Sequence, residues 1–202
     1  MKTCVQNALR AVFLAALIGS FSGYGRLALA QDQEAATPDW TTESYGDWSV
    51  RCATREGVPP CDIVQVATDN KTGAQVMRLS IAHAGDRERY GVQVIVPLGV
   101  LISGGVLVRI DDAHDIKDLK FTRCDAGGCY IEALLDAQML TPFRRGNKGV
   151  LAIIDGNGKP LVVPLSFKGF TAASDVMIDR NRQWAQDKGN KTENQKPPRR
   201  LP

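Results

Sequence analysis

Residues 77–96, MRLSIAHAGDRERYGVQVIV, carry the pattern that decides the fold class. Successive side chains of a β-strand point to opposite faces, so a half-buried strand alternates apolar with polar residues. This stretch alternates twice, once on each side of a polar interval. Its apolar positions are Met77, Leu79, Ile81, Tyr90, Val92, Val94 and Val96. The pattern predicts two half-buried strands.

The period of two continues on both sides of this stretch. Strands are predicted at residues 48–52, 63–66, 77–81, 90–96, 106–110 and 119–123. About six short strands without helices between them indicate an antiparallel β-sandwich or barrel. We therefore expect a mainly β, disulfide-stapled single domain over residues 45–185, with one or two short helices.

After residue 131 the pattern also predicts helices. Asp136 is a candidate cap for a short helix that carries Leu135, Met139 and Phe143, is broken by Pro142 and stops at Gly146. Strands at 149–154 and 161–167 follow, joined by the hairpin signal Asp155-Gly156-Asn157-Gly158. A final helix begins at the candidate cap Thr171, with Phe170, Ala173, Met177 and Trp184 on one stripe.

The first 30 residues have the features of an export signal. Lys2 and Arg10 precede or flank the apolar run AVFLAALI at 11–18, and Ala28-Leu29-Ala30 offers a signal-peptidase site before Gln31. The run is much shorter than the roughly 20 residues of a membrane-spanning helix. We expect residues 1–30 to be cleaved, residues 31–44 to form a flexible leader, and the protein to be periplasmic, outer-membrane-associated or secreted.

The charge balance changes when this signal is removed. The 202-residue chain has 25 Lys and Arg against 22 Asp and Glu, and Lys2, Arg10 and Arg26 lie in the signal. The mature chain therefore has no formal net charge, which gives no electrostatic argument for a nucleic-acid partner. Residues 186–202 are predicted to be a disordered basic tail. It is either simply solvated or contacts an anionic membrane or polysaccharide through Lys188, Lys191, Lys196, Arg199 and Arg200.

Export leaves four cysteines in an oxidising compartment, with three pairings open. We favour Cys52–Cys61 and Cys124–Cys129, because each pair brackets turn-forming residues. Neither spacing is the C-x-x-C of a redox site, and no pair of histidines completes a zinc site. The sequence predicts no metal and no cofactor.

Candidate catalytic residues are few. The acidic cluster Asp111, Asp112, His114, Asp115 and Asp118 is interpreted as a solvated loop between strands, and His83 as a surface or strand-end residue. Ser166 lies within a predicted strand and lacks the sharp turn of a hydrolase nucleophile. Arg144, Arg145 and Lys148 could face an anionic ligand, although a solvated helix end is favoured. Trp40, Trp48 and Trp184 are too scattered for a stacking platform.

Several segments in the same order resemble the invasion-associated locus B family of small exported bacterial proteins. They are YGDWSVRC at 45–52, CDIVQ at 61–65, VPLGVLISGGVLVRID at 96–111, FTRCDAGGCYIEALLD at 121–136 and VPLSFKGF at 163–170. The resemblance implies a role near the cell envelope, linked in some pathogenic members to host-cell attachment and entry. It brings no established catalytic residues.

The leading hypothesis is a non-enzymatic exported protein that binds a protein, glycan or surface partner. The alternative is a periplasmic structural protein that supports envelope integrity or stress tolerance. A third hypothesis is a hydrolase built from carboxylates such as Asp111 and Asp115. The oligomeric state stays open.

Overall fold

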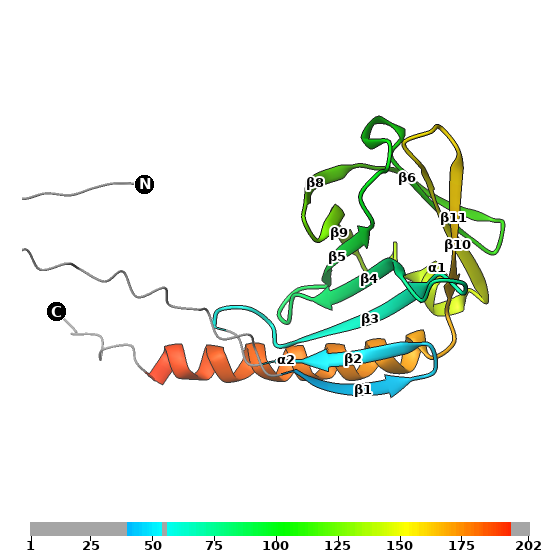
Figure 1. Cartoon of the computed structure of the whole chain (residues 1–202). Helices are drawn as coiled ribbons and strands as arrows, with labels where there is room; N and C mark the ends of the chain where they lie inside the picture. The colour runs from blue at the N-terminus through cyan, green and yellow to red at the C-terminus, as the bar shows by residue number, and fades with distance from the viewer. Residues whose placement is uncertain (1–39, 54–55, 195–202) are drawn as a thin grey trace, which may run out of the picture. The chain divides into compact units, whose positions relative to one another are not determined.

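The computed structural model describes residues 40–53 and 56–194, which form two antiparallel sheets and two α-helices (Figure 1). The larger sheet has the order β1-β2-β3-β4-β5-β9-β8. Its strands are β1 (Thr41–Tyr45), β2 (Trp48–Cys52), β3 (Cys61–Thr68), β4 (Gln75–His83), β5 (Arg89–Val96), β9 (Gly128–Asp136) and β8 (Phe121–Asp125).

The smaller sheet has the order β11-β10-β6-β7. Its strands are β11 (Pro160–Ser166), β10 (Lys148–Ile154), β6 (Val106–Ile110) and β7 (His114–Leu119). The α-helices are α1 (Thr141–Arg145) and α2 (Phe170–Asn194), and a short 3-10 helix, η1, covers Ile102–Gly104. The expected antiparallel, sandwich-like β fold is thereby confirmed.

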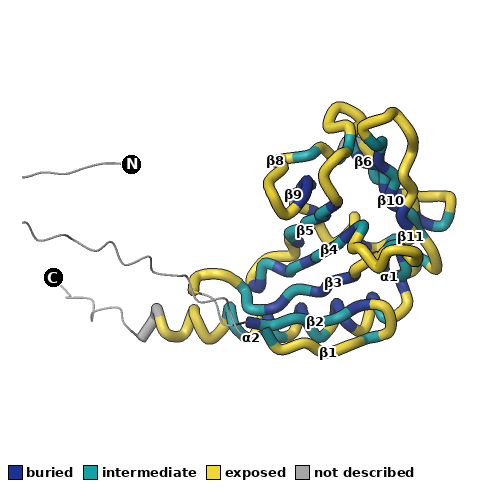
Figure 2. The backbone as a smooth tube through the Cα atoms, viewed as in Figure 1, coloured by how far each residue is buried: buried dark blue, intermediate teal, exposed yellow. Residues whose placement is uncertain are grey.

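The seven-stranded sheet has an inner and an outer face. Along β4, Met77, Leu79 and Ile81 are buried, whereas the residues between them are partly exposed. Figure 2 shows this alternation of buried and intermediate positions on β3 and β4. We call the face that carries Met77, Leu79 and Ile81 the inner face. Helix α2 packs against β1 to β4, and Met77 and Leu165 of β11 belong to one hydrophobic cluster.

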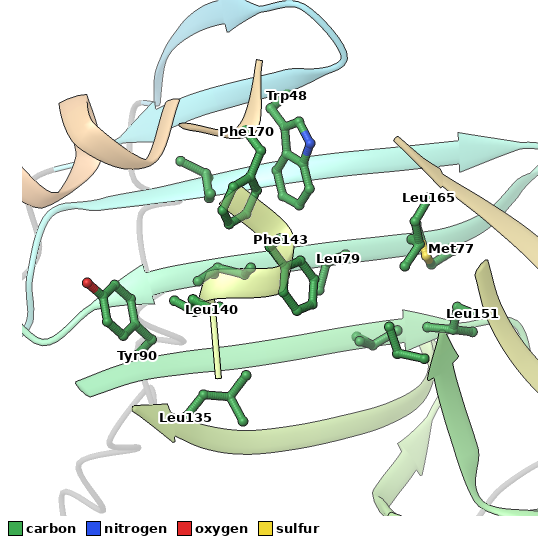
Figure 3. Packing of buried hydrophobic residues seen from close by; sticks show 14 of the residues in the cluster. Trp48, Met77, Leu79, Tyr90, Leu135, Leu140, Phe143, Leu151, Leu165 and Phe170 are labelled. Carbon is green, nitrogen blue, oxygen red and sulfur yellow. The ribbon is translucent and has the colours of Figure 1, made fainter. Parts of the chain in front are cut away.

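An aromatic cluster joins the sheets and helices in the core. The ring centroids of Trp48 and Phe170 are 5.0 Å apart and the rings meet edge-on (Figure 3). The ring centroids of Phe143 and Phe167 are 5.4 Å apart, also edge-on. The indole Nε1 of Trp48 donates to the backbone oxygen of Ser166 at 2.8 Å. Burying these rings attaches α1, α2 and β11 to the inner face.

One buried amide adds a polar anchor between helix α2 and the inner face. The Nδ2 of Asn181 donates to the backbone oxygens of Cys61 and His83 at 2.9 and 3.0 Å, and its Oδ1 accepts from the Cys61 N–H at 3.0 Å. These bonds fully satisfy a side chain that has no exposed surface.

The predicted helix around Leu135 begins too early. Residues up to Asp136 belong to β9, and α1 starts only at Thr141. Leu135 pairs with Tyr90 across the ladder and continues the inner-face alternation, so the strand period prevails over the helical one. Asp136 accepts a bond from the Met139 N–H in the connecting turn, rather than capping a helix.

Both ends of the domain are more ordered than expected. Strand β1 pairs with β2 from Thr41 onward, so residues 41–44 are not part of a flexible leader. Helix α2 is 25 residues long and includes residues 186–194, so the predicted disordered tail is wrong for these residues. Pairs four residues apart support this extension: Gln183 donates to Asp187 at 3.0 Å, and Lys188 lies over the Trp184 ring.

The structure contains the disulfides Cys52–Cys61 and Cys124–Cys129, the pairing that the sequence favours. Each joins residues directly opposite each other on neighbouring strands, β2 with β3 and β8 with β9. Residues 155–158 form the turn between β10 and β11, as the hairpin signal predicted.

Candidate functional site

The outer face of the seven-stranded sheet carries a hollow of about 690 Å³. Three small residues from the central strands lie under it: Ser80 and Ala82 on β4 and Gly91 on β5. Ala82 is paired with Gly91 in the ladder, so no long side chain rises from this part of the sheet. A Cβ atom added to Gly91 would meet no atom within 4 Å. We call this site the sheet hollow.

An ion pair and an indole ring form one wall of the sheet hollow. The Nε and Nη2 of Arg51 donate to the two carboxylate oxygens of Asp62 at 3.2 and 2.6 Å. The Arg51 guanidinium also lies 5.0 Å from the centroid of the Trp40 ring. A guanidinium that is held by both a carboxylate and an aromatic ring has little freedom, so this wall is preformed.

The opposite wall comes from β5 and β9. The Nε2 of Gln93 donates to the carboxylate of Glu132 at 2.8 Å, and Arg123 of β8 lies 3.6 Å from the same carboxylate. Leu134 adds an apolar side chain that is 69% exposed. This wall therefore combines polar acceptors with one exposed hydrophobic group.

Arg78 lines the hollow without a partner of its own. Its Nε is buried and has no hydrogen-bond partner, and no ion pair of Arg78 occurs within residues 40–53 and 56–194. In the ladder Arg78 lies between the apolar residues Val66 and Ile95. Buried polar groups in proteins are nearly always hydrogen-bonded, so this exception needs an explanation.

The acidic cluster lies away from the sheet hollow and is not a loop throughout. Residues from His114 onward form strand β7. Asp115 accepts two bonds from Arg109, at 2.7 and 2.9 Å, and this pairing lowers the pKa of its carboxyl to about 2. Backbone N–H groups of Lys148 and Asn147 lower the pKa of the Asp111 carboxyl. Both carboxylates therefore stay ionised near neutral pH and are poor proton donors. Among the described residues, no group of three or more His, Cys, Asp or Glu could hold a metal ion.

His83 ends a strand as predicted, but it is buried rather than on the surface, with only 1% of its area exposed. Its Nδ1 accepts from the Gly85 N–H at 3.0 Å, and its Nε2 lies 3.8 Å from the Glu88 carboxylate. Burial lowers the pKa of the imidazole, and the nearby Glu88 charge opposes that effect. The surface interpretation overlooked Glu88, which the β4–β5 loop brings back beside the ring.

The basic candidates are distributed over several elements. Arg144, in the last turn of α1, pairs with Asp175 at 2.8 Å, and Lys148 lies 3.6 Å from Asp112. Lys188 and Lys191 are exposed on α2, whereas Lys196, Arg199 and Arg200 lie outside the described residues. Neither described α-helix is long and apolar enough to cross a membrane.

The remaining candidates lie on separate elements. The Ser166 hydroxyl, on β11, donates to Asp47 at 2.6 Å. Trp48 is in the core, Trp184 is on α2, and Trp40 lines the sheet hollow. Sequence reasoning missed the hollow, because alternation assigns its residues to a solvent-facing side. Its one signal in the sequence is Gly91 inside a strand pattern, which often marks close approach of a ligand or backbone.

Comparisons with known proteins agree with one another. The family model described as invasion associated locus B protein matches residues 48–177. An invasion protein B homologue of Brucella abortus (strain 2308) is 27% identical over 167 residues, which are 82% of this chain and 94% of that protein. Invasion protein B of Bartonella bacilliformis is 23% identical over 164 residues, covering 79% of this chain and 87% of its own. The crystal structure of invasion associated protein b from Bartonella henselae shares the fold, with a TM-score of 0.63 and 24% identity, covering 71% of this chain and 98% of that one.

Proposed function

This chain belongs to the invasion-associated locus B family, and from that premise we propose that it is an exported, non-enzymatic binding protein. Its sheet hollow holds a partner at the cell envelope or at a host-cell surface. Relatives named for invasion support a role in contact with a host, and the pattern of residues 1–30 supports export.

The observation that carries the proposal is the sheet hollow itself. Binding sites are typically concave, largely preformed, and supplied with a few fixed polar groups. The Arg51–Asp62 pair and the Gln93–Glu132 bond provide such groups on either side of a low floor. The hollow lies on the outer face of the sheet, whereas the core packs against the inner face of the same strands. A partner can therefore occupy the hollow without disturbing the core contacts.

Filling the hollow tests this proposal directly. Gly91→Val adds a side chain into open space, because a Cβ there meets nothing within 4 Å. Gly189→Val is a matched control on the exposed end of α2, where an added Cβ also meets nothing. The labelled mature protein is incubated with envelope preparations of the producing bacterium and with cultured host cells. We expect Gly91→Val to lose most of the binding and Gly189→Val to retain it. Equal binding by all three proteins, or none by the wild type, contradicts the proposal.

A separate experiment locates the protein. Intact cells that carry a tag after Pro202 are treated with protease, with a known periplasmic protein as control. Loss of the tagged protein while the control survives supports a surface role and host contact. Survival of both until the outer membrane is permeabilised restricts the partner to the periplasm. An unprocessed chain in the cytoplasm contradicts export.

A further inference from the structure

We propose that the sheet hollow binds a sugar that carries a carboxylate, with Arg78 as the residue that contacts this group. The inference rests on the proposed function, because it assigns a ligand class to the same hollow.

Arg78 has unused hydrogen-bonding capacity. A guanidinium carries five N–H donors, and the Nε of Arg78 is buried without a hydrogen-bond partner among the described residues. The other two arginines nearby are engaged: Arg51 with Asp62, and Arg123 with Asp125 and Glu132. A carboxylate matches the planar fork of a guanidinium and can accept two parallel bonds from it. Such a ligand would pair with the Nη groups of Arg78, whose side chain lines the hollow.

The charges that line the hollow also limit which ligands fit it. Its lining carries two arginines, Arg51 and Arg78, and two carboxylates, Asp62 and Glu132. Asp62 already neutralises Arg51, so only one cation is available to a ligand. A densely charged polyanion would be repelled by the two carboxylates. A single carboxylate among neutral groups fits this distribution.

The polar groups of the walls suit the hydroxyl groups of a sugar. Sugar hydroxyls both donate and accept, and the walls offer the acceptors Asp62 and Glu132, the amide of Gln93 and the hydroxyl of Ser80. A peptide is less suited to this face, because it adds to a sheet by pairing with free backbone groups at an edge. The backbones of β4 and β5 are already paired on both sides. The observations therefore favour an acidic sugar over an acidic peptide.

The test uses the full mature protein and three probes: D-glucuronate, D-glucose and the tripeptide Glu-Glu-Glu. Binding is followed by NMR through the backbone amide signals of β4, β5 and β9. We expect glucuronate to shift signals around Ser80, Ala82 and Gly91 and to bind more tightly than glucose. Arg78→Gln should weaken glucuronate binding about tenfold and remove the preference over glucose, because a charge-assisted bond is lost. Arg87→Gln, an equal charge change in the exposed β4–β5 loop, should bind like the wild type.

Three results would overturn the inference: equal affinity for glucuronate and glucose, shifts confined to other parts of the protein, or full binding by Arg78→Gln. Binding of the tripeptide that depends on Arg78, without binding of glucuronate, would also overturn it and identify an acidic peptide as ligand. The proposed function is judged separately. If Gly91→Val abolishes cell-surface binding but glucuronate does not bind, only the sugar assignment fails. If Gly91→Val binds cells normally, the proposed function fails.

Discussion

Arg78 lowers the stability of the unliganded protein, in addition to the role in binding that we propose for it. Its buried Nε loses contact with water and gains no hydrogen bond in return, and such a loss destabilises a fold by about 1–3 kcal/mol. Arg78→Met keeps an unbranched apolar stem between Val66 and Ile95 and removes the buried donor.

We expect Arg78→Met to raise the free energy of unfolding by about 1 kcal/mol, measured by urea denaturation. Arg87→Met, at an exposed position, serves as control and should change it by less than about 0.5 kcal/mol. A clear loss of stability in Arg78→Met would show that the guanidinium is satisfied in the folded protein.

His83 makes stability depend on pH above the range where carboxylates titrate. The unfolded imidazole has a pKa of about 6.5, and burial lowers the pKa in the folded state, with Glu88 opposing. Below about 6.5 the unfolded chain therefore binds more protons than the folded one. The contribution of neutral His83 to the free energy of unfolding is therefore fully present above about pH 6.5. It is lost as the pH falls toward the pKa of His83 in the folded protein.

We expect the urea concentration at the unfolding midpoint to decrease when the pH is lowered from 7.5 to 5.5. The decrease should be smaller in His83→Gln. The chain has two histidines, so His114→Gln, at an exposed position on β7, is the matched control and should keep the wild-type pH dependence. If His114→Gln flattens the profile instead, burial of His83 is not its origin.

At the scale of elements, the docking of α2 depends on Asn181. Truncation to alanine leaves the N–H and the oxygen of Cys61 and the oxygen of His83 without these partners in a buried site. We expect Asn181→Ala to lower the free energy of unfolding by about 2–4 kcal/mol in guanidinium denaturation. Asn190→Ala, on the exposed end of the same helix, should be close to neutral. Similar effects of both variants would argue against a specific anchor.

Strands were easier to predict than helices in this chain. Where a strand has one buried face, as β4 and β5 do, the period of two is clear. Leu135, Met139 and Phe143 also have helical spacing, and only the pairing of Leu135 with Tyr90 decides for a strand. The acidic residues of β7 led to the prediction of a loop where the structure has a strand. This strand lies at the edge of its sheet, where polar side chains are common.

The candidate site could be predicted only in part. Sequence spacing favoured both disulfides, because each pair is local. The sheet hollow depends on register, which places Ala82 opposite Gly91 and Asp62 opposite Arg51. Each of these four residues lies on a different strand, and they are well separated in the sequence. No local motif encodes that juxtaposition, so the sequence could not reveal it.

At the scale of the whole molecule, the C-terminal part of α2 adds little to the folded domain. From residue 186 to residue 191 every described side chain is exposed. We expect a chain that ends at Asp187 to melt within about 2 °C of the full mature protein in circular dichroism. A chain that ends at Arg180 lacks Asn181 and should lose its cooperative transition. A large drop in melting temperature for the chain that ends at Asp187 would show that residues 188–202 contribute to the stability of the domain.

The alternation along β4 has an evolutionary consequence. Met77, Leu79 and Ile81 pack in the core and stabilise the fold, whereas Ser80 and Ala82 form the floor of the hollow. If the hollow binds a ligand as proposed, selection for stability and selection for ligand binding act on alternating positions of one strand. Homologues that keep the same core residues can differ in the outer-face residues, and each such substitution changes the depth of the hollow. Relatives of this protein are thus expected to diverge in ligand preference faster than in architecture.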